Sequence, residues 1–155
     1  MAEKNTKPVQ GPGGRGPKGP RPKVENPGKL FMRLLAYIMK NYAQGLGGVI
    51  HCYSYSREMA EEYVKMGFYI GIGGVVTFKN AKKLKDVAAA IPIEKIVLET
   101  DCPYMAPEPH RGTRNDSRNI PYVIAKIAEI KGVSVEEVEQ TTRENAFALF
   151  TKVPR

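Results

Sequence analysis

The stretch KIVLETDCP, residues 95–103, has the pattern of a short buried β-strand that ends in carboxylates and is stopped by proline. Alternate residues of a strand share a face, so Val97, Glu99 and Asp101 are expected on one side. Two carboxylates beside a buried strand are costly unless a metal ion, an arginine or water accompanies them. Parallel α/β proteins carry active sites at this end of their strands. A functional site and a solvent-exposed strand end both remain open on these residues alone.

Two further strands are predicted upstream, each followed by a helix, and Ser56 is the expected cap of the first of these helices. The first is the apolar run that ends in His51, and the second is residues 68–74, whose glycines share one face. Strand–helix–strand–helix–strand order predicts a parallel sheet with right-handed crossovers. His51 and Asp101 are then expected on the same rim. The glycine face favours close approach by a ligand or another backbone, and a crowded barrel corner explains it equally well.

The segment after Asp101 is a polar loop, residues 102–119, rich in proline and arginine. Its Arg111, Arg114 and Arg118 have side chains that match phosphate geometry, although surface arginines in loops are ordinary. A helix is predicted over residues 120–131, with Asn119 as its cap. A capping box that starts at Ser134 opens a last helix, which ends near residue 150 with Phe150 expected on its inward side.

The net charge of +8 is concentrated before the predicted domain. Residues 1–45 carry nine Lys or Arg against two acids, whereas residues 46–155 carry fifteen against fourteen. Net charge therefore gives no support for DNA binding by the folded part. The two cysteines, Cys52 and Cys102, have neither zinc-site nor redox-pair spacing, which favours free thiols in a reducing cytoplasm.

The chain before the domain divides into two segments. Residues 1–28 are rich in proline, glycine and basic side chains, and we expect them to be disordered. Residues 29–45 are expected to form a short amphipathic helix, with Leu30, Leu34 and Ile38 as its apolar stripe, and a junction. The helix is too short to span a bilayer but able to lie on a membrane surface or on a partner. This opening resembles the amino terminus of bacterial ABC-type multidrug exporters. Residues 46–155 are assigned to the globular domain.

Five motifs in the globular part resemble, in order and spacing, the carboxyl-terminal part of the TatD family of metal-dependent deoxyribonucleases. They are GVIHCYSYS, GFYIGIGG, IPIEKIVLETDCPYMAP, HRGTRN and TTRENAFALF. The resemblance implies an α/β fold, the last three strand–helix units of a (β/α)₈ TIM-type barrel of the amidohydrolase type. It also implies a hydrolase that cleaves phosphodiester bonds in DNA with a divalent metal (Mg, Mn or Zn).

The resemblance carries roles onto particular residues. His51 matches the metal-ligand histidine of the sixth strand, and Asp101 matches the aspartate of the eighth, which binds metal and takes a proton from water. Glu99, on the same face as Asp101, is a candidate to orient a metal-ligating side chain without binding the metal itself. Arg111 and Arg114 are assigned to substrate contact or to loop ordering, with no choice between them.

This chain also departs from the family pattern. The His-x-His pair of the first strand, and the glutamate and histidine of the middle strands, have no counterparts here, and three strands cannot close a barrel. We therefore expect little or no nuclease activity from this chain alone. One hypothesis is a site completed by self-association or by a separate amino-terminal fragment. The alternatives are a non-catalytic remnant, and a module whose basic tail and helix bind a membrane surface or nucleic acid.

Overall fold

The computed structural model describes residues 27–42 and 45–154, and in them helices alternate with strands in the predicted order. The regular elements are α1 (Pro27–Tyr42), β1 (Val49–Ile50), α2 (Arg57–Lys65), β2 (Tyr69–Ile72), α3 (Lys82–Ala90), β3 (Ile96–Leu98), α4 (Ile120–Lys131) and α5 (Val135–Leu149). Short 3₁₀ turns lie at Gly74–Thr77, Ile93–Lys95 and Ser117–Asn119.

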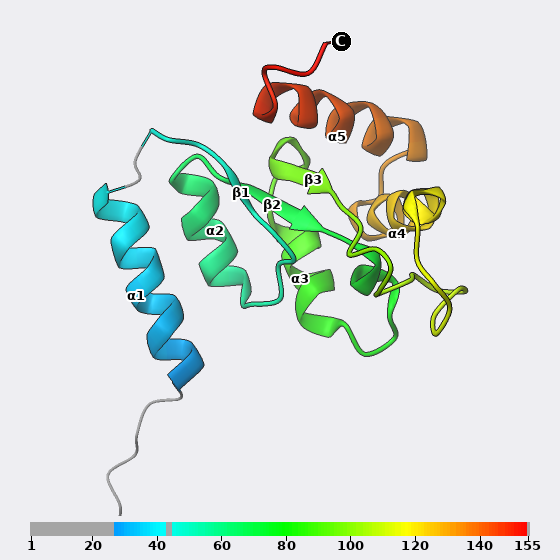
Figure 1. The fold of residues 1–155 in the computed structure, drawn as a ribbon, viewed down its shortest axis with the longest axis horizontal. Coiled ribbons are helices and arrows are strands. Elements are labelled where there is room, and N and C mark those ends of the chain that lie inside the picture. The colour runs from blue at the N-terminus through cyan, green and yellow to red at the C-terminus, as the bar shows by residue number, and fades with distance from the viewer. Residues whose placement is uncertain (1–26, 43–44, 155) are drawn as a thin grey trace, which may run out of the picture.

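The three strands form one parallel sheet in the order β1-β2-β3. Ile50 lies opposite Ile70, and Ile72 lies opposite Leu98. The predicted parallel sheet is therefore confirmed, with each crossover made by a helix. In Figure 1, α1 lies outside α2 towards the β1 edge, and α5 lies against the β3 edge.

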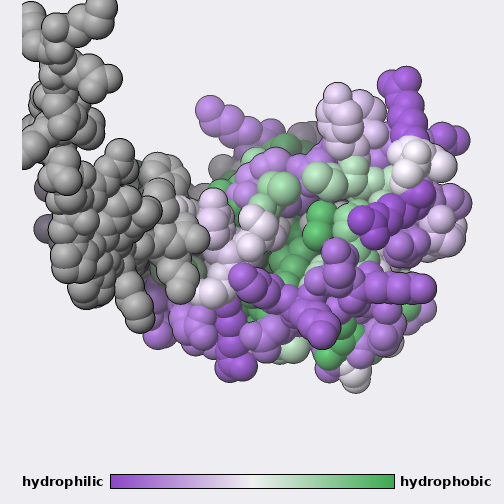
Figure 2. Space-filling view, turned by 90° about the horizontal axis from the view of Figure 1, so that it is seen from below, coloured by the Kyte–Doolittle hydropathy of each residue, from purple (hydrophilic) through white to green (hydrophobic). Residues whose placement is uncertain are grey.

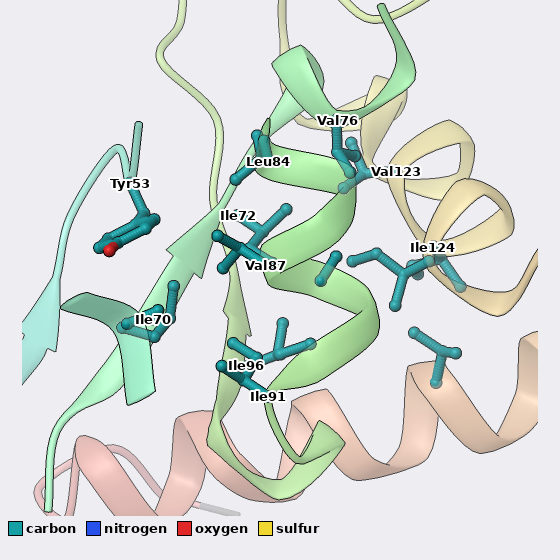
Figure 3. Close-up of a cluster of buried hydrophobic side chains, with 14 of the residues drawn as sticks. Tyr53, Ile70, Ile72, Val76, Leu84, Val87, Ile91, Ile96, Val123 and Ile124 are labelled. Atoms are coloured by element: carbon teal, nitrogen blue, oxygen red, sulfur yellow. The ribbon is translucent and has the colours of Figure 1, made fainter. Parts of the chain in front are cut away.

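The helices pack on the sheet face that carries the isoleucines. Ile70, Ile72 and Ile96 are fully buried, and Figure 3 shows Ile72 of β2 beside Val87 and Leu84 of α3. Burying such a side chain completely contributes about 1.5–3 kcal/mol each. These contacts fix the strands relative to one another, and so fix which side chains meet at their carboxyl ends.

Helix α1 forms as predicted, but a different stripe packs on the domain. Leu35 and Met39 contact the edge of the core, whereas Leu30, Leu34 and Ile38, the predicted apolar stripe, are exposed. Within the part of the chain that the structure describes, no helix combines the length and apolarity needed to cross a membrane. The predicted disorder of residues 1–28 lies almost entirely outside the described residues.

Figure 2 shows one face of the molecule from below, where hydrophilic side chains surround an apolar strip.

The burial of one apolar side chain in the last helix differs from expectation. Phe150, predicted to point inward, is about half exposed, because the backbone leaves the helical region at this residue and carries the ring past the last turn.

The predicted helix caps are only partly formed. Ser134 Oγ accepts the backbone N–H of Glu137, as the capping box predicts. Ser56 and Asn119 occupy the residues before their helices but make no side-chain capping bond. The Asn119 amide donates instead to the side chain of Asn115, which removes it from the helix end.

Candidate functional site

Three side chains meet at the carboxyl ends of the outer strands. His51 follows β1, and Glu99 and Asp101 follow β3. His51 Nε2 lies 3.6 Å from Asp101 Oδ1 and 3.7 Å from Glu99 Oε2. The imidazole is 65% exposed, whereas the side chains of Glu99 and Asp101 are 12% and 19% exposed. The structure thus brings together the histidine and both carboxylates that the strand pattern places on one rim.

Glu99 is the more buried of the two acids. Its Oε1 accepts the backbone N–H of Cys52 at 2.7 Å. Burial raises the pKa of the Glu99 carboxyl above its ordinary value, and the Cys52 N–H and His51 oppose that rise. A buried carboxylate with a backbone donor is a fixed hydrogen-bond acceptor rather than a freely moving surface charge.

Cys52 also lies at this rim. Its Sγ lies 3.5 Å from Asp101 Oδ2, so the thiol can donate to that carboxylate. Burial, together with the nearby Asp101 carboxylate, raises the pKa of the thiol. Both cysteines are free, which agrees with the predicted absence of pairing. In the sequence, the one indication that Cys52 lies at the rim was its position directly after His51 at the end of a strand.

The loop after Asp101 is held by Asn115, a buried residue that the sequence analysis did not single out. Its backbone N–H donates to the carbonyl of Pro103 at 3.0 Å, and its side-chain amide donates to the carbonyl of Tyr104 at 2.8 Å. Its Oδ1 accepts from Asn119. The polar side chain at the end of the HRGTRN motif therefore closes the loop onto the residues that follow Asp101.

The loop arginines separate into different environments. The Arg111 guanidinium lies over the Phe78 ring, 4.4 Å from its centroid, which favours a loop-ordering contact. Arg118 donates to both carboxylate oxygens of Asp116. Arg114 lines an open pocket of about 370 Å³ together with His110, Asp116 and Arg118. Of the two arginines proposed for substrate contact, Arg111 is held against an aromatic ring and Arg114 lines this pocket.

Because Asp116 is paired with Arg118, we expect the Asp116 carboxyl to titrate at an unusually low pH. Hydrogen bonds from the Arg118 side chain and backbone lower the pKa of Asp116 from its ordinary value to about 2. The stabilisation that this depressed pKa provides is present above about pH 4 and is lost as the pH falls through 2. Arg118→Ala should raise the pKa towards the ordinary value in a carboxyl-carbon NMR titration. Arg114→Ala, which removes a weaker contribution, should raise it less; a wild-type midpoint near 4 would contradict the pairing.

Comparison with known proteins identifies the family. A family model described as TatD related DNase matches residues 30–151. The chain belongs to this family. Over 108 residues it is 48% identical to YabD, an uncharacterized metal-dependent hydrolase of Bacillus subtilis (strain 168), in a match that covers 70% of this chain and 42% of YabD. It is 42% identical over 116 residues to YcfH, an uncharacterized metal-dependent hydrolase of Escherichia coli (strain K12), covering 75% of this chain and 44% of YcfH.

The fold agrees with a solved TatD structure. The crystal structure of YJJV, a TATD homolog from Escherichia coli K12, superimposes with a TM-score of 0.73 and 33% sequence identity. That match covers 79% of this chain and 47% of the other. The chain thus spans less than half the length of the TatD relatives it matches. The family match begins at residue 30, so it also includes most of α1.

The rim has side chains of the types that bind divalent metal ions, but only a small number of them. Imidazole nitrogen and carboxylate oxygen suit divalent ions such as Zn²⁺, Mn²⁺ and Mg²⁺. The donor atoms of His51, Glu99 and Asp101 lie close enough for the negative charge of the two acids to act at one point. Among the described residues, however, no group of three or more His, Cys, Asp or Glu side chains has the arrangement of a complete metal site. The donor types at the rim thus suit a divalent ion, but the described residues alone do not form a complete site.

Proposed function

We propose that this chain supplies the last three strand–helix units of a (β/α)₈ barrel that hydrolyses phosphodiester bonds in DNA with a divalent metal. The observation that carries the proposal is the meeting of His51 and Asp101 at the carboxyl rim of a parallel sheet, where His51 Nε2 lies 3.6 Å from Asp101 Oδ1. Membership of the TatD related DNase family supports DNA as the substrate class.

Within this proposal the residues of the rim have separate tasks. His51 and Asp101 hold the metal, which when bound lowers the pKa of water and offsets the phosphate charge. Asp101 accepts a proton from the attacking water, because its carboxylate has an oxygen at the rim. Arg114, in its open pocket, faces the backbone phosphates of the substrate, and Arg111 keeps the loop on Phe78.

The chain by itself is expected to have weak activity or none. Two protein ligands leave most positions on a hard divalent ion to water, so the ion binds poorly. The remaining ligands would come from further strands of the barrel, supplied by self-association or by an amino-terminal fragment. A non-catalytic remnant is the alternative, and it predicts no metal binding at this rim.

The activity test has two arms. The purified chain is incubated with single-stranded DNA and Mg²⁺ or Mn²⁺, and little turnover is expected. A chimera in which residues 47–155 replace the matching part of YabD provides the missing strands, and there we expect metal-dependent cleavage. Asp101→Ala in the chimera should lower the rate about a hundredfold or more, the usual range for an acid–base residue.

Intact YabD and the exposed-surface variant Asp86→Ala of the chimera are the matched controls. Asp86 lies on α3. In the described part of the chain its carboxylate forms one ion pair, with the exposed Arg57 at 4.0 Å. A folded chimera that cleaves DNA equally well with Asp101→Ala would contradict the assigned role. Robust turnover by the unmodified chain would contradict its incompleteness.

A second candidate function rests on α1. Leu30, Leu34, Tyr37 and Ile38 expose apolar surface along one side of this helix. Together with the basic residues that precede it, this face suits the surface of an anionic membrane, with nucleic acid as the other anionic partner. Binding to anionic vesicles that persists after deletion of residues 1–45 would exclude this function for the segment.

A further inference from the structure

The side chain of Glu99 crosses the central strand of the sheet. Glu99 follows β3 and Cys52 follows β1, and β2 lies between those two strands. The Glu99 carboxylate nevertheless accepts the Cys52 N–H at 2.7 Å. This bond therefore connects the two outer strands at their carboxyl ends, above the strand that separates them.

Gly71 on β2 provides the space for this crossing. A Cβ added to Gly71 would overlap the Glu99 carboxylate, standing 2.7 Å from its Cδ and 2.9 Å from its Oε1. The backbone of Gly71 lies outside the positive-φ region, so its conformation suits any residue. Its carbonyl also accepts the Tyr53 N–H at 3.2 Å. The Glu99 carboxylate can thus keep this position only because residue 71 has no Cβ, and the close approach expected over the glycine face is made by a side chain.

The accepting carboxylate lies where the backbone after β1 is strained. Cys52 has φ of 49°, in the left-handed region that residues with a side chain rarely adopt. Such a conformation persists only where neighbouring contacts hold it. Here the Cys52 and Tyr53 N–H groups are both bound, the first to Glu99 and the second to Gly71. The other Glu99 oxygen lies 3.7 Å from His51 Nε2.

We propose that Glu99 is a positioning residue: lodged over Gly71, its carboxylate fixes the turn after β1 and so holds the His51 ring against Asp101. The positioning itself is independent of metal, and its value for hydrolysis rests on the proposed function. This arrangement also depends on Gly71. A side chain at position 71 would displace the Glu99 carboxylate from the Cys52 N–H without filling the core.

The test uses the full chain without metal and compares Gly71→Ala, Glu99→Ala and the double variant. Backbone hydrogen exchange of the Cys52 amide and the χ1 coupling of His51 are measured by NMR. Because a bond to a charged acceptor is lost, we expect Cys52 exchange to accelerate at least about 10-fold in each single variant. The double variant should be no worse than Glu99→Ala, because the added methyl group then meets no carboxylate. Glu99→Gln, which retains the oxygen acceptor, should keep most of the protection.

Ile70→Val is the matched control. Ile70 precedes Gly71 on β2 but points into the core, so its truncation lowers stability without touching Glu99. Unchanged Cys52 exchange and unchanged His51 coupling in both Gly71→Ala and Glu99→Ala would overturn the proposal. So would equal acceleration in Ile70→Val. If Gly71→Ala does not fold, the contrast between Glu99→Gln and Glu99→Ala decides the matter alone.

A parallel Mn²⁺ titration of the same variants separates this inference from the proposed function. Loss of Cys52 protection accompanied by about tenfold weaker Mn²⁺ binding supports both. Loss of protection in a protein whose wild type binds no Mn²⁺ supports the positioning role and contradicts the metal-dependent one.

Discussion

Asp101→Asn is expected to weaken Mn²⁺ binding at the rim about a hundredfold. The substitution keeps the size and one oxygen of the side chain but removes the negative charge that lies 3.6 Å from His51 Nε2. Removing a residue that merely supports a metal ligand commonly weakens affinity 10- to 100-fold, so removing a ligand should reach at least the upper end. Mn²⁺-induced broadening of NMR signals from residues 51–53 and 99–102 measures this even when binding is weak.

Asp116→Asn is the control for the metal experiment. Asp116 is also a carboxylate with a strong partner, but it is exposed in the loop and paired with Arg118. Broadening at the rim should survive this change. If Asp101→Asn leaves the broadening of residues 51–53 intact, or if it is Asp116→Asn that removes it, the ion binds elsewhere and the rim is not a metal site.

The parts of this fold that follow from backbone periodicity could be predicted from sequence. Apolar runs alternating with helical patterns are typical of parallel strands, and parallel strands bring their carboxyl ends to one edge. This reasoning placed His51 and Asp101 on a common rim although 49 residues separate them, and the structure brings them together. No knowledge of individual side-chain contacts was needed for that conclusion.

Contacts between specific side chains could not be predicted in this way. The passage of Glu99 over Gly71, and the stacking of Arg111 on Phe78, depend on rotamers and on loop paths that no local pattern encodes. Helix α1 shows the same limit. Four-residue spacing indicates that apolar stripes exist, but only the neighbouring elements decide that Leu35 packs on the core and Leu34 does not.

Asn145→Ala should lower the free energy of unfolding by about 2–4 kcal/mol. Asn145 lies on α5 and is 7% exposed, and its side-chain amide donates to the carbonyls of Ile93 at 2.9 Å and Ile96 at 2.8 Å. Each hydrogen bond contributes about 1 kcal/mol, and carbonyls left buried without a donor cost about 1–3 kcal/mol. Urea unfolding, with an unchanged dependence on urea concentration, measures the loss.

Gln140→Ala tests whether this loss belongs to the buried amide rather than to α5 in general. Gln140 is an amide on the exposed side of the same helix, and its side chain donates to Glu144 at 3.1 Å. An exposed substitution of this kind should change stability by less than about 0.5 kcal/mol. Because α5 covers the β3 edge, the Asn145 bonds hold the strand that carries Glu99 and Asp101. Equal effects of the two substitutions would show that the helix, and not its link to β3, sets the stability of the rim.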